Sequence, residues 1–192
     1  MPPSPERLQL MADRQDIWDC LQRISRGIDR FDRDVFLSGY HADAVIDAGA
    51  LVGSPAQAYE SGAALHEAGQ ISTMHSLFNH TCQIQDDTAH AETYFEYVGH
   101  NRDGSNWLAG GRYIDRLERR LSEWKVAFRM TVMEWSGSMP GNEVPLFAGV
   151  EDVHANGAPS RSREDPSYVR PLVNRRAMRA PEDPGSLGRP AD

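Results

Sequence analysis

Residues 73–100, TMHSLFNHTCQIQDDTAHAETYFEYVGH, contain two stretches in which polar and apolar side chains alternate with a period of two. This period is typical of β-strands that bury one face. The two acidic residues at 86–87 are turn formers, so we expect strands over residues 73–85 and 88–100 that pair as a hairpin.

The sequence after the hairpin continues in the same manner. The cluster NRDGS at 101–105 predicts a turn, and a third strand is expected over residues 107–118. The polar segment 119–123 then predicts a turn into a fourth strand over residues 124–133. The second half of the domain is therefore expected to be a long antiparallel meander.

The sequence before the hairpin has a helical period instead. Residues 8–31 carry apolar side chains at steps of three and four, and residues 32–37 could add a short second helix. Residues 44–47 predict a brief strand, and a serine cap with a first-turn proline begins a helix over 54–68. Helices followed by a meander indicate an α+β fold in which a curved antiparallel sheet closes over the helices and leaves a conical cavity.

The composition also divides the chain. We expect a loose leader over residues 1–7, the α+β domain over 8–138 and a C-terminal extension over 139–192. Residues 156–192 are dense in Gly, Pro, Ser, Arg and Asp and hold few large apolar groups, so burial cannot offset the entropy of ordering them. This tail is expected to be disordered or docked on a neighbouring subunit.

Charge and cysteine content exclude several classes of protein. A formal charge of −8 argues against a nucleic-acid or anionic-membrane partner. The N-terminus lacks the layout of a signal peptide, and no apolar stretch approaches the roughly 20 residues that span a bilayer. Two cysteines, Cys20 and Cys82, are far apart, which argues against a disulfide framework or a cysteine-based zinc site. We expect a soluble, cytoplasmic protein.

The histidines and glycines do not follow cofactor motifs. No two histidines have helical spacing with a carboxylate as third ligand, and no H-E-x-x-H motif occurs. No strand–G-x-G-x-x-G–helix unit is present either. We therefore expect no metal and no dinucleotide, that is, no cofactor at all. The histidines weighed for a metal are His41, His66, His80, His90 and His100.

Two residues are candidates for acid/base chemistry. His75 opens a predicted strand, and strict alternation places it on the same face as Leu77 and Asn79. Facing a cavity, its imidazole could abstract a proton near neutral pH; alternatively, it bonds a loop carbonyl. Asp29 lies on or beside the apolar stripe of the first helix, where a carboxylate needs a partner; alternatively, it is solvated near the helix end. Pairing with Asp29 would fix the tautomer of His75 and stabilise its imidazolium.

Other polar residues are weaker candidates. The phenol of Tyr40 could protonate or polarise a leaving hydroxyl, and Asp47 could act as a second acid or base, but a capping or interstrand hydrogen bond explains either residue equally well. Arg129 faces either the cavity or the solvent side of its strand. Three further residues are expected to line the cavity and bind substrate: Asn79, Tyr94 and Tyr113.

Several short segments occur in a particular order: IWD at 17–19 with Asp29 ten residues on, YHADAV at 40–45, TMH at 73–75, DTAHAETYF at 87–95, GGRYIDR at 110–116 and EWKVA at 123–127. Each segment is weakly informative alone. Together, over roughly residues 10–135, they resemble the SnoaL-like domains of the nuclear transport factor 2-like superfamily.

The resemblance implies a range of activities rather than one. Relatives include scytalone dehydratase, bile acid 7α-dehydratase, hexachlorocyclohexane dehydrochlorinase, polyketide cyclases and formaldehyde-releasing lyases. The dehydratase and dehydrochlorinase members use a His supported by an Asp, and His75 and Asp29 match those positions. Arg129 falls where the dehydrochlorinase has a basic cavity group. Ile24 stands where the dehydrochlorinase has a lysine, which argues against halide elimination. Because one fold hosts many functions, the resemblance does not name the reaction.

The resemblance therefore implies a cofactor-independent lyase acting on an aromatic or alicyclic small molecule. The alternatives are a double-bond isomerase or polyketide cyclase, which would use the same base, and a non-catalytic small subunit of a ring-hydroxylating dioxygenase. A homo-oligomer is also implied, with a trimer favoured over a dimer. Candidates for its apolar interface on the outer face of the sheet are Phe78, Ile84, Val98 and Ile114.

Overall fold

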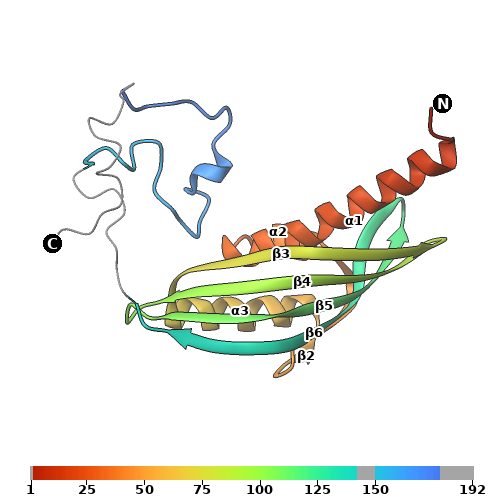
Figure 1. The fold of residues 1–192 in the computed structure, drawn as a ribbon, viewed down its shortest axis with the longest axis horizontal. Helices are drawn as coiled ribbons and strands as arrows, with labels where there is room; N and C mark the ends of the chain where they lie inside the picture. The colour runs from red at the N-terminus through yellow and green to blue at the C-terminus, as the bar shows by residue number, and fades with distance from the viewer. Residues whose placement is uncertain (1, 142–149, 178–192) are drawn as a thin grey trace.

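A computed structural model describes residues 2–141 and 150–177 of the chain. In these residues, a curved sheet wraps around three α-helices, and the long strands lie side by side (Figure 1). The elements, in chain order, are α1 (Pro5–Asp29), α2 (Arg33–Ser38), β1 (Tyr40–Asp47), β2 (Val52–Gly53), α3 (Pro55–Gly69), β3 (Gln70–Gln85), β4 (Thr88–Asn101), β5 (Asn106–Arg120), β6 (Glu123–Met139) and the 3-10 helix η1 (Pro166–Tyr168).

The sheet is mixed rather than purely antiparallel. Its strand order is β2-β1-β6-β5-β4-β3, and the predicted meander β3–β6 is confirmed as antiparallel. β1, however, pairs in parallel with β6, the last strand of the meander. The chain crosses from β1 through α3 to the far edge of the sheet and returns strand by strand, so β6 arrives beside β1 running in the same direction. The expectation of an all-antiparallel sheet was wrong at this one pairing.

Helix α1 begins earlier than its apolar pattern predicts. Ser4 caps the helix, its hydroxyl oxygen accepting a hydrogen bond from the Arg7 amide, and Pro5 occupies the first turn. Residues 5–7 are therefore helical and not part of a loose leader. The apolar stripe begins later because the first turns of α1 are exposed, and only cap chemistry marks where the helix starts.

The apolar stripe of α1 forms the main core with the inner face of the sheet. Ile17 and Leu21 are fully or almost fully buried against small inward-facing residues such as Ala89 and Ala91 of β4. Small side chains under the helix let the sheet approach it closely. This packing fixes the C-terminal end of α1, where Asp29 lies, above the start of β3.

Part of the C-terminal extension is docked on its own chain. The hydroxyl of Tyr168 donates to Asp32 over 2.6 Å, and Arg26 donates to Ser167 over 3.2 Å. Residues 156–177 are therefore not disordered, and they dock on α1 and α2 of their own chain. The prediction counted only apolar burial, whereas charged and aromatic contacts hold this segment. Residues 178–192 lie outside the described part of the chain.

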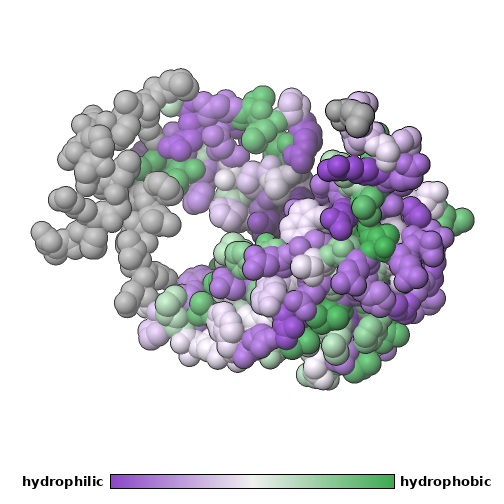
Figure 2. Space-filling model, turned by 45° about the vertical axis from the view of Figure 1, so that its right-hand side comes forward, coloured by the Kyte–Doolittle hydropathy of each residue, from purple (hydrophilic) through white to green (hydrophobic). Residues whose placement is uncertain are grey.

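The surface seen in Figure 2 is mostly hydrophilic, with small hydrophobic patches between the polar side chains. Among the helices of the described residues, none is both long and apolar enough to cross a membrane.

Gly27 allows α1 and α2 to approach each other. A Cβ atom at Gly27 would lie 2.4 Å from the Phe36 amide nitrogen, whereas one at Gly62 of α3 would meet only an Ile28 methyl group at 3.5 Å. We expect Gly27→Ala to lower the free energy of unfolding by about 1–3 kcal/mol through overpacking. Gly62→Ala, the matched control, should raise it by about 0.5–1 kcal/mol through helix propensity. Denaturant unfolding measures both, and a stabilising Gly27→Ala would contradict this packing.

Candidate active site

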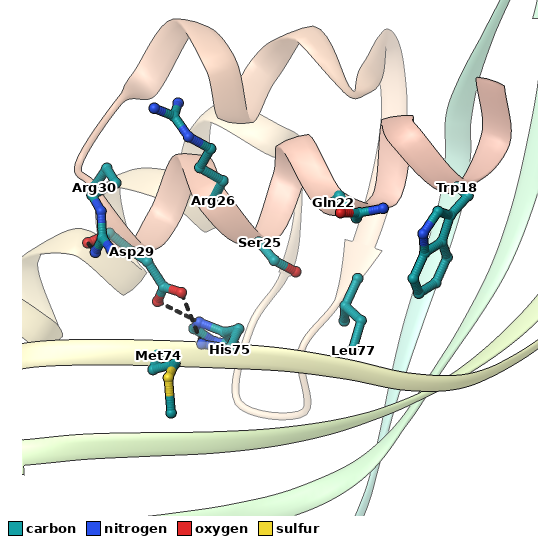
Figure 3. Close-up of a pocket in the computed structure, with 9 residues that line it drawn as sticks. All are labelled: Trp18, Gln22, Ser25, Arg26, Asp29, Arg30, Met74, His75 and Leu77. Carbon is teal, nitrogen blue, oxygen red and sulfur yellow. Dashed lines mark hydrogen bonds and ion pairs between the residues drawn. The ribbon is translucent and has the colours of Figure 1, made fainter. Parts of the chain in front are cut away.

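Asp29 and His75 form a two-point contact between the end of α1 and the start of β3 (Figure 3). The backbone amide of His75 donates to Asp29 Oδ2 over 2.8 Å, and the ring nitrogen Nδ1 lies 2.7 Å from Asp29 Oδ1. The side chains of His75 and Asp29 are only 12% and 10% exposed, respectively. The structure thus places the two predicted site residues together, within direct hydrogen-bonding distance.

Electrostatics define the protonation of this pair. Burial would raise the pKa of Asp29, but hydrogen bonds and charge interaction with His75 outweigh it and hold the pKa below its usual value. The carboxylate is therefore ionised at neutral pH and accepts a hydrogen bond from Nδ1 of His75, an arrangement that keeps a proton on Nδ1 in the neutral form of the ring. The basic lone pair of His75 is then on Nε2.

His75 lines an open cavity of about 130 Å³ beneath α1, to which α2, α3 and the sheet also contribute residues. The same side chain, with Ser25, also lines a groove of about 310 Å³ between α1 and β3, shown in Figure 3. The imidazole therefore borders both this smaller cavity and the wider groove beside β3. Polar and charged residues that line the inner cavity with His75 are Ser25, Tyr40, Tyr113, Arg129 and Thr131.

A known protein family matches this sequence. The family model described as the SnoaL-like domain matches residues 9–130, more than half of the chain. The chain belongs to the SnoaL-like domain family. No curated protein matches the sequence.

Solved structures share the fold of this SnoaL-like domain. A hexachlorocyclohexane dehydrochlorinase (LinA) of type 2 aligns with a TM-score of 0.67 at 19% identity, over 74% of this chain and 99% of its own. A scytalone dehydratase-like protein from Novosphingobium aromaticivorans DSM 12444 aligns with a TM-score of 0.60 at 13% identity, over 70% and 95%. A cystatin-like protein of unknown function from Nostoc punctiforme PCC 73102 aligns at 0.56 and 17% identity, over 64% and 92%. The fold is therefore nuclear transport factor 2-like, and lyases occur among its neighbours.

In this SnoaL-like domain Arg129 is buried in the cavity wall and is paired with Asp115. Its Nε and Nη2 atoms donate to the two carboxylate oxygens over 2.7 and 2.8 Å. Burial disfavours the cation, but Asp115 outweighs burial and raises the pKa of Arg129. The guanidinium also lies 4.2 Å from the centre of the Tyr113 ring. Arg129 therefore faces the cavity, but as half of a neutralised pair.

The two cavity phenols are protonated at neutral pH. Burial raises the pKa of Tyr113 to about 12 and also raises that of Tyr40. The Tyr40 ring centre lies 5.9 Å from the Arg129 guanidinium, so both phenols border the same cation. Each could donate a hydrogen bond to an oxygen atom in the cavity.

Three predicted site residues lie outside the cavity. Asp47 accepts a hydrogen bond from the Gly49 amide over 3.0 Å, so it caps the turn after β1. Asn79 is exposed because a bulge between Leu77 and His80 breaks the alternation on which its placement depended. Tyr94 is 44% exposed, and it points away from the helices because its strand neighbours face them.

Sequence reasoning missed Asp115 and a cluster around the His75 ring. Asp115 faces Arg129 across the β5–β6 pair, and strand parity combined with charge could have revealed it. The cluster consists of His66, Gln70 and Tyr97, and the Tyr97 ring centre lies 4.8 Å from that of His75. No spacing rule connects the end of α3 with these strands. In the part of the chain that the structure describes, no group of three potential ligand side chains could hold a metal ion.

We expect Asp115→Asn to lower the free energy of unfolding by about 3–5 kcal/mol, because it leaves the buried Arg129 cation uncompensated. The double variant Asp115→Leu/Arg129→Met removes both charges and should be more stable than Asp115→Asn. Denaturant unfolding of both variants tests this. Equal losses in the two variants would show that the contact between the charges is not what stabilises the cavity wall.

Proposed function

We propose that this SnoaL-like domain is a cofactor-independent acid/base lyase that eliminates a hydroxyl or related leaving group from a mainly apolar small molecule. The observation that carries the proposal is the 2.7 Å contact of His75 Nδ1, whose ring lines the cavity, with an ionised, buried Asp29. A buried carboxylate that orients an imidazole is one arrangement that supports general-base catalysis. The chemistry needs no metal or organic cofactor.

The proposed reaction begins with removal of a proton from carbon by His75 Nε2. The electron pair of the broken C–H bond forms the new double bond as the adjacent C–O bond breaks. A phenol, Tyr40 or Tyr113, transfers its proton to the departing hydroxyl as the C–O bond breaks, so the group leaves as water. The proton on His75 Nε2 then passes to the phenolate, which restores both groups. Asp29 stabilises the imidazolium that forms during the step.

The size of the cavity limits the reacting part of the substrate. A cavity of about 150 Å³ lined by apolar side chains can hold benzene, and the cavity here is about 130 Å³. We therefore propose that a single six-membered aromatic or alicyclic ring occupies it. Larger substituents would extend into the groove between α1 and β3, to which Gln22 and Arg26 contribute polar groups.

A double-bond isomerase or cyclase is the second candidate, because the same base faces a cavity whose protonated phenols could polarise a carbonyl oxygen. An isomerase returns the proton to another carbon and conserves the mass of the substrate, whereas a lyase loses a fragment. Mass analysis of the product separates the two reactions. The non-catalytic alternative, a dioxygenase small subunit, gives no product when the chain is assayed alone.

The proposed assembly is a homo-oligomer, with a trimer favoured, formed through the outer face of the sheet. Ile84 does not contribute as predicted, because it packs inward against the core. Phe78 is 49% exposed. Val98 and Ile114 are half-buried, and because their neighbours along the strand face the helices, these two side chains lie on the outer face of the sheet. Other exposed apolar side chains on strands of this sheet include Met74, Tyr94, Met130 and Trp135.

We expect Asp29→Asn and His75→Gln each to lower kcat by about 10²–10⁴-fold, the usual contribution of a general base. The double variant should be scarcely slower than the poorer single variant, because the two residues act as one unit. Turnover is measured in a screen of hydroxylated aromatic and alicyclic compounds with chelator-treated protein. Activity that returns only when a metal is added would contradict the cofactor-free mechanism.

Matched controls come from the same residue types outside the cavity. Asp47→Asn alters a turn cap and His90→Gln an exposed side chain, so both should retain turnover. Melting temperatures of all five variants show whether a loss of turnover is a loss of folding. A fully active His75→Gln protein would end the proposed mechanism.

We expect light scattering to give a mass near three chains at micromolar concentration. Tyr94→Glu combined with Trp135→Glu should shift the mass toward one chain, because charges on a covered apolar face oppose association. Glu at exposed Ala42, outside this face, is the control. A wild-type protein that is already a monomer would contradict the proposed assembly.

A further inference from the structure

The C-terminal extension contacts the residues that support the His75 ring. Arg161 donates through Nη1 to the carbonyl oxygen of His66 over 3.2 Å and through Nη2 to that of Gln70 over 2.6 Å. These carbonyls belong to the junction at which α3 ends and β3 begins. The guanidinium also lies 4.3 Å from the centre of the Phe31 ring, two residues after Asp29.

The junction in turn holds a buried cluster against His75. Gln70 Oε1 lies 2.7 Å from His66 Nδ1 and accepts a hydrogen bond from the Tyr97 hydroxyl over 2.5 Å. The Tyr97 ring centre is 4.8 Å from that of His75, and the His66 ring presents an edge at 6.2 Å. Gly99 provides the space for this cluster, because a Cβ there would lie 2.0 Å from Gln70 Nε2.

The segment that carries Arg161 is itself anchored at the end of α1. Asp165 lies 3.6 Å from Arg30 and accepts hydrogen bonds from the amides of Ser160 and Ser167. Tyr168 packs under the Arg26 guanidinium at 4.4 Å. The segment that carries Arg161 thus contacts two elements: α1, which carries Asp29, and the start of β3, which carries His75.

This contact is an addition to the family domain. The SnoaL-like model ends at residue 130, and 74% of this chain covers 99% of the type 2 dehydrochlorinase. About a quarter of the chain therefore has no counterpart in that structure. The support for His75 that Arg161 supplies comes from this chain's own extension.

We propose that Arg161 is a positioning residue for His75, acting through the α3–β3 junction and the His66–Gln70–Tyr97 cluster. Its two hydrogen bonds fix the carbonyls that set where Gln70 and the start of β3 lie. Gln70 holds Tyr97, and Tyr97 limits the rotation of the His75 ring. The effect on turnover rests on the proposed function, but the positioning itself does not.

The test uses full-length Arg161→Gln, with Arg163→Gln as the matched control. Arg163 lies two residues further along the same segment, is exposed, and pairs with Asp32 rather than with the junction. Hydrogen exchange of the His75 amide, which donates to Asp29, reports the pair without any substrate. It is compared with the slowest amides of β5 and β6, which report global unfolding.

We expect the His75 amide to exchange about tenfold faster in Arg161→Gln, while β5 and β6 amides and the Arg163→Gln protein stay near wild type. Arg161→Lys should be intermediate, since an ammonium keeps the charge but not the fork of donors. In a substrate assay, kcat should fall several-fold with KM little changed. Exchange that is the same in Arg161→Gln and Arg163→Gln would overturn the proposal, and it would do so whether or not the protein is a lyase.

Discussion

The two hydrogen bonds that Asp29 accepts from His75 join the end of the longest helix to the edge strand of the sheet. A carboxylate buried at that depth is stable only when its charge is compensated, and His75 supplies both an amide and a ring donor. The apolar stripe of α1 fixes where Asp29 lies, and the pairing of β3 with β4 fixes where His75 lies. The core thus determines the geometry of the site. His75 in turn compensates the charge of Asp29 at the edge of the core.

In the cavity wall, His75 is the side chain that can act as a base. Arg129 is the other strongly polar side chain that faces the cavity, and Asp115 holds its charge in a bidentate pair. Tyr40 and Tyr113 stay protonated because burial raises the pKa of each phenol. A base, two neutral donors and a neutralised ion pair in a space of about 130 Å³ suit proton transfer on a small ring.

Much of this fold follows from local sequence rules, and the exceptions have physical causes. Period-two alternation predicts β3–β6, and an apolar stripe of helical period predicts α1 except for its first turn, because burial on one face sets both patterns. Alternation fails at Asn79, where a bulge adds a residue to one strand. The sequence pattern indicated His75 and Asp29, and strand parity combined with charge could also have indicated Asp115, but no local rule could reveal the Gln70–Tyr97 bond, since that contact depends on register between distant segments. The docked extension was missed because charged pairs, rather than apolar area, hold it.

The account depends on Asp29 fixing the tautomer of His75, and nitrogen NMR of the ¹⁵N-labelled imidazole measures that directly. At neutral pH the account predicts a proton on Nδ1 and a free lone pair on Nε2 in the wild-type protein. In Asp29→Asn the Nδ1 proton loses its anionic acceptor, and the spectrum should show a mixture of tautomers or the Nε2-protonated form. A wild-type ring that carries its proton on Nε2 at neutral pH, or a spectrum that Asp29→Asn leaves unchanged, would contradict the central claim.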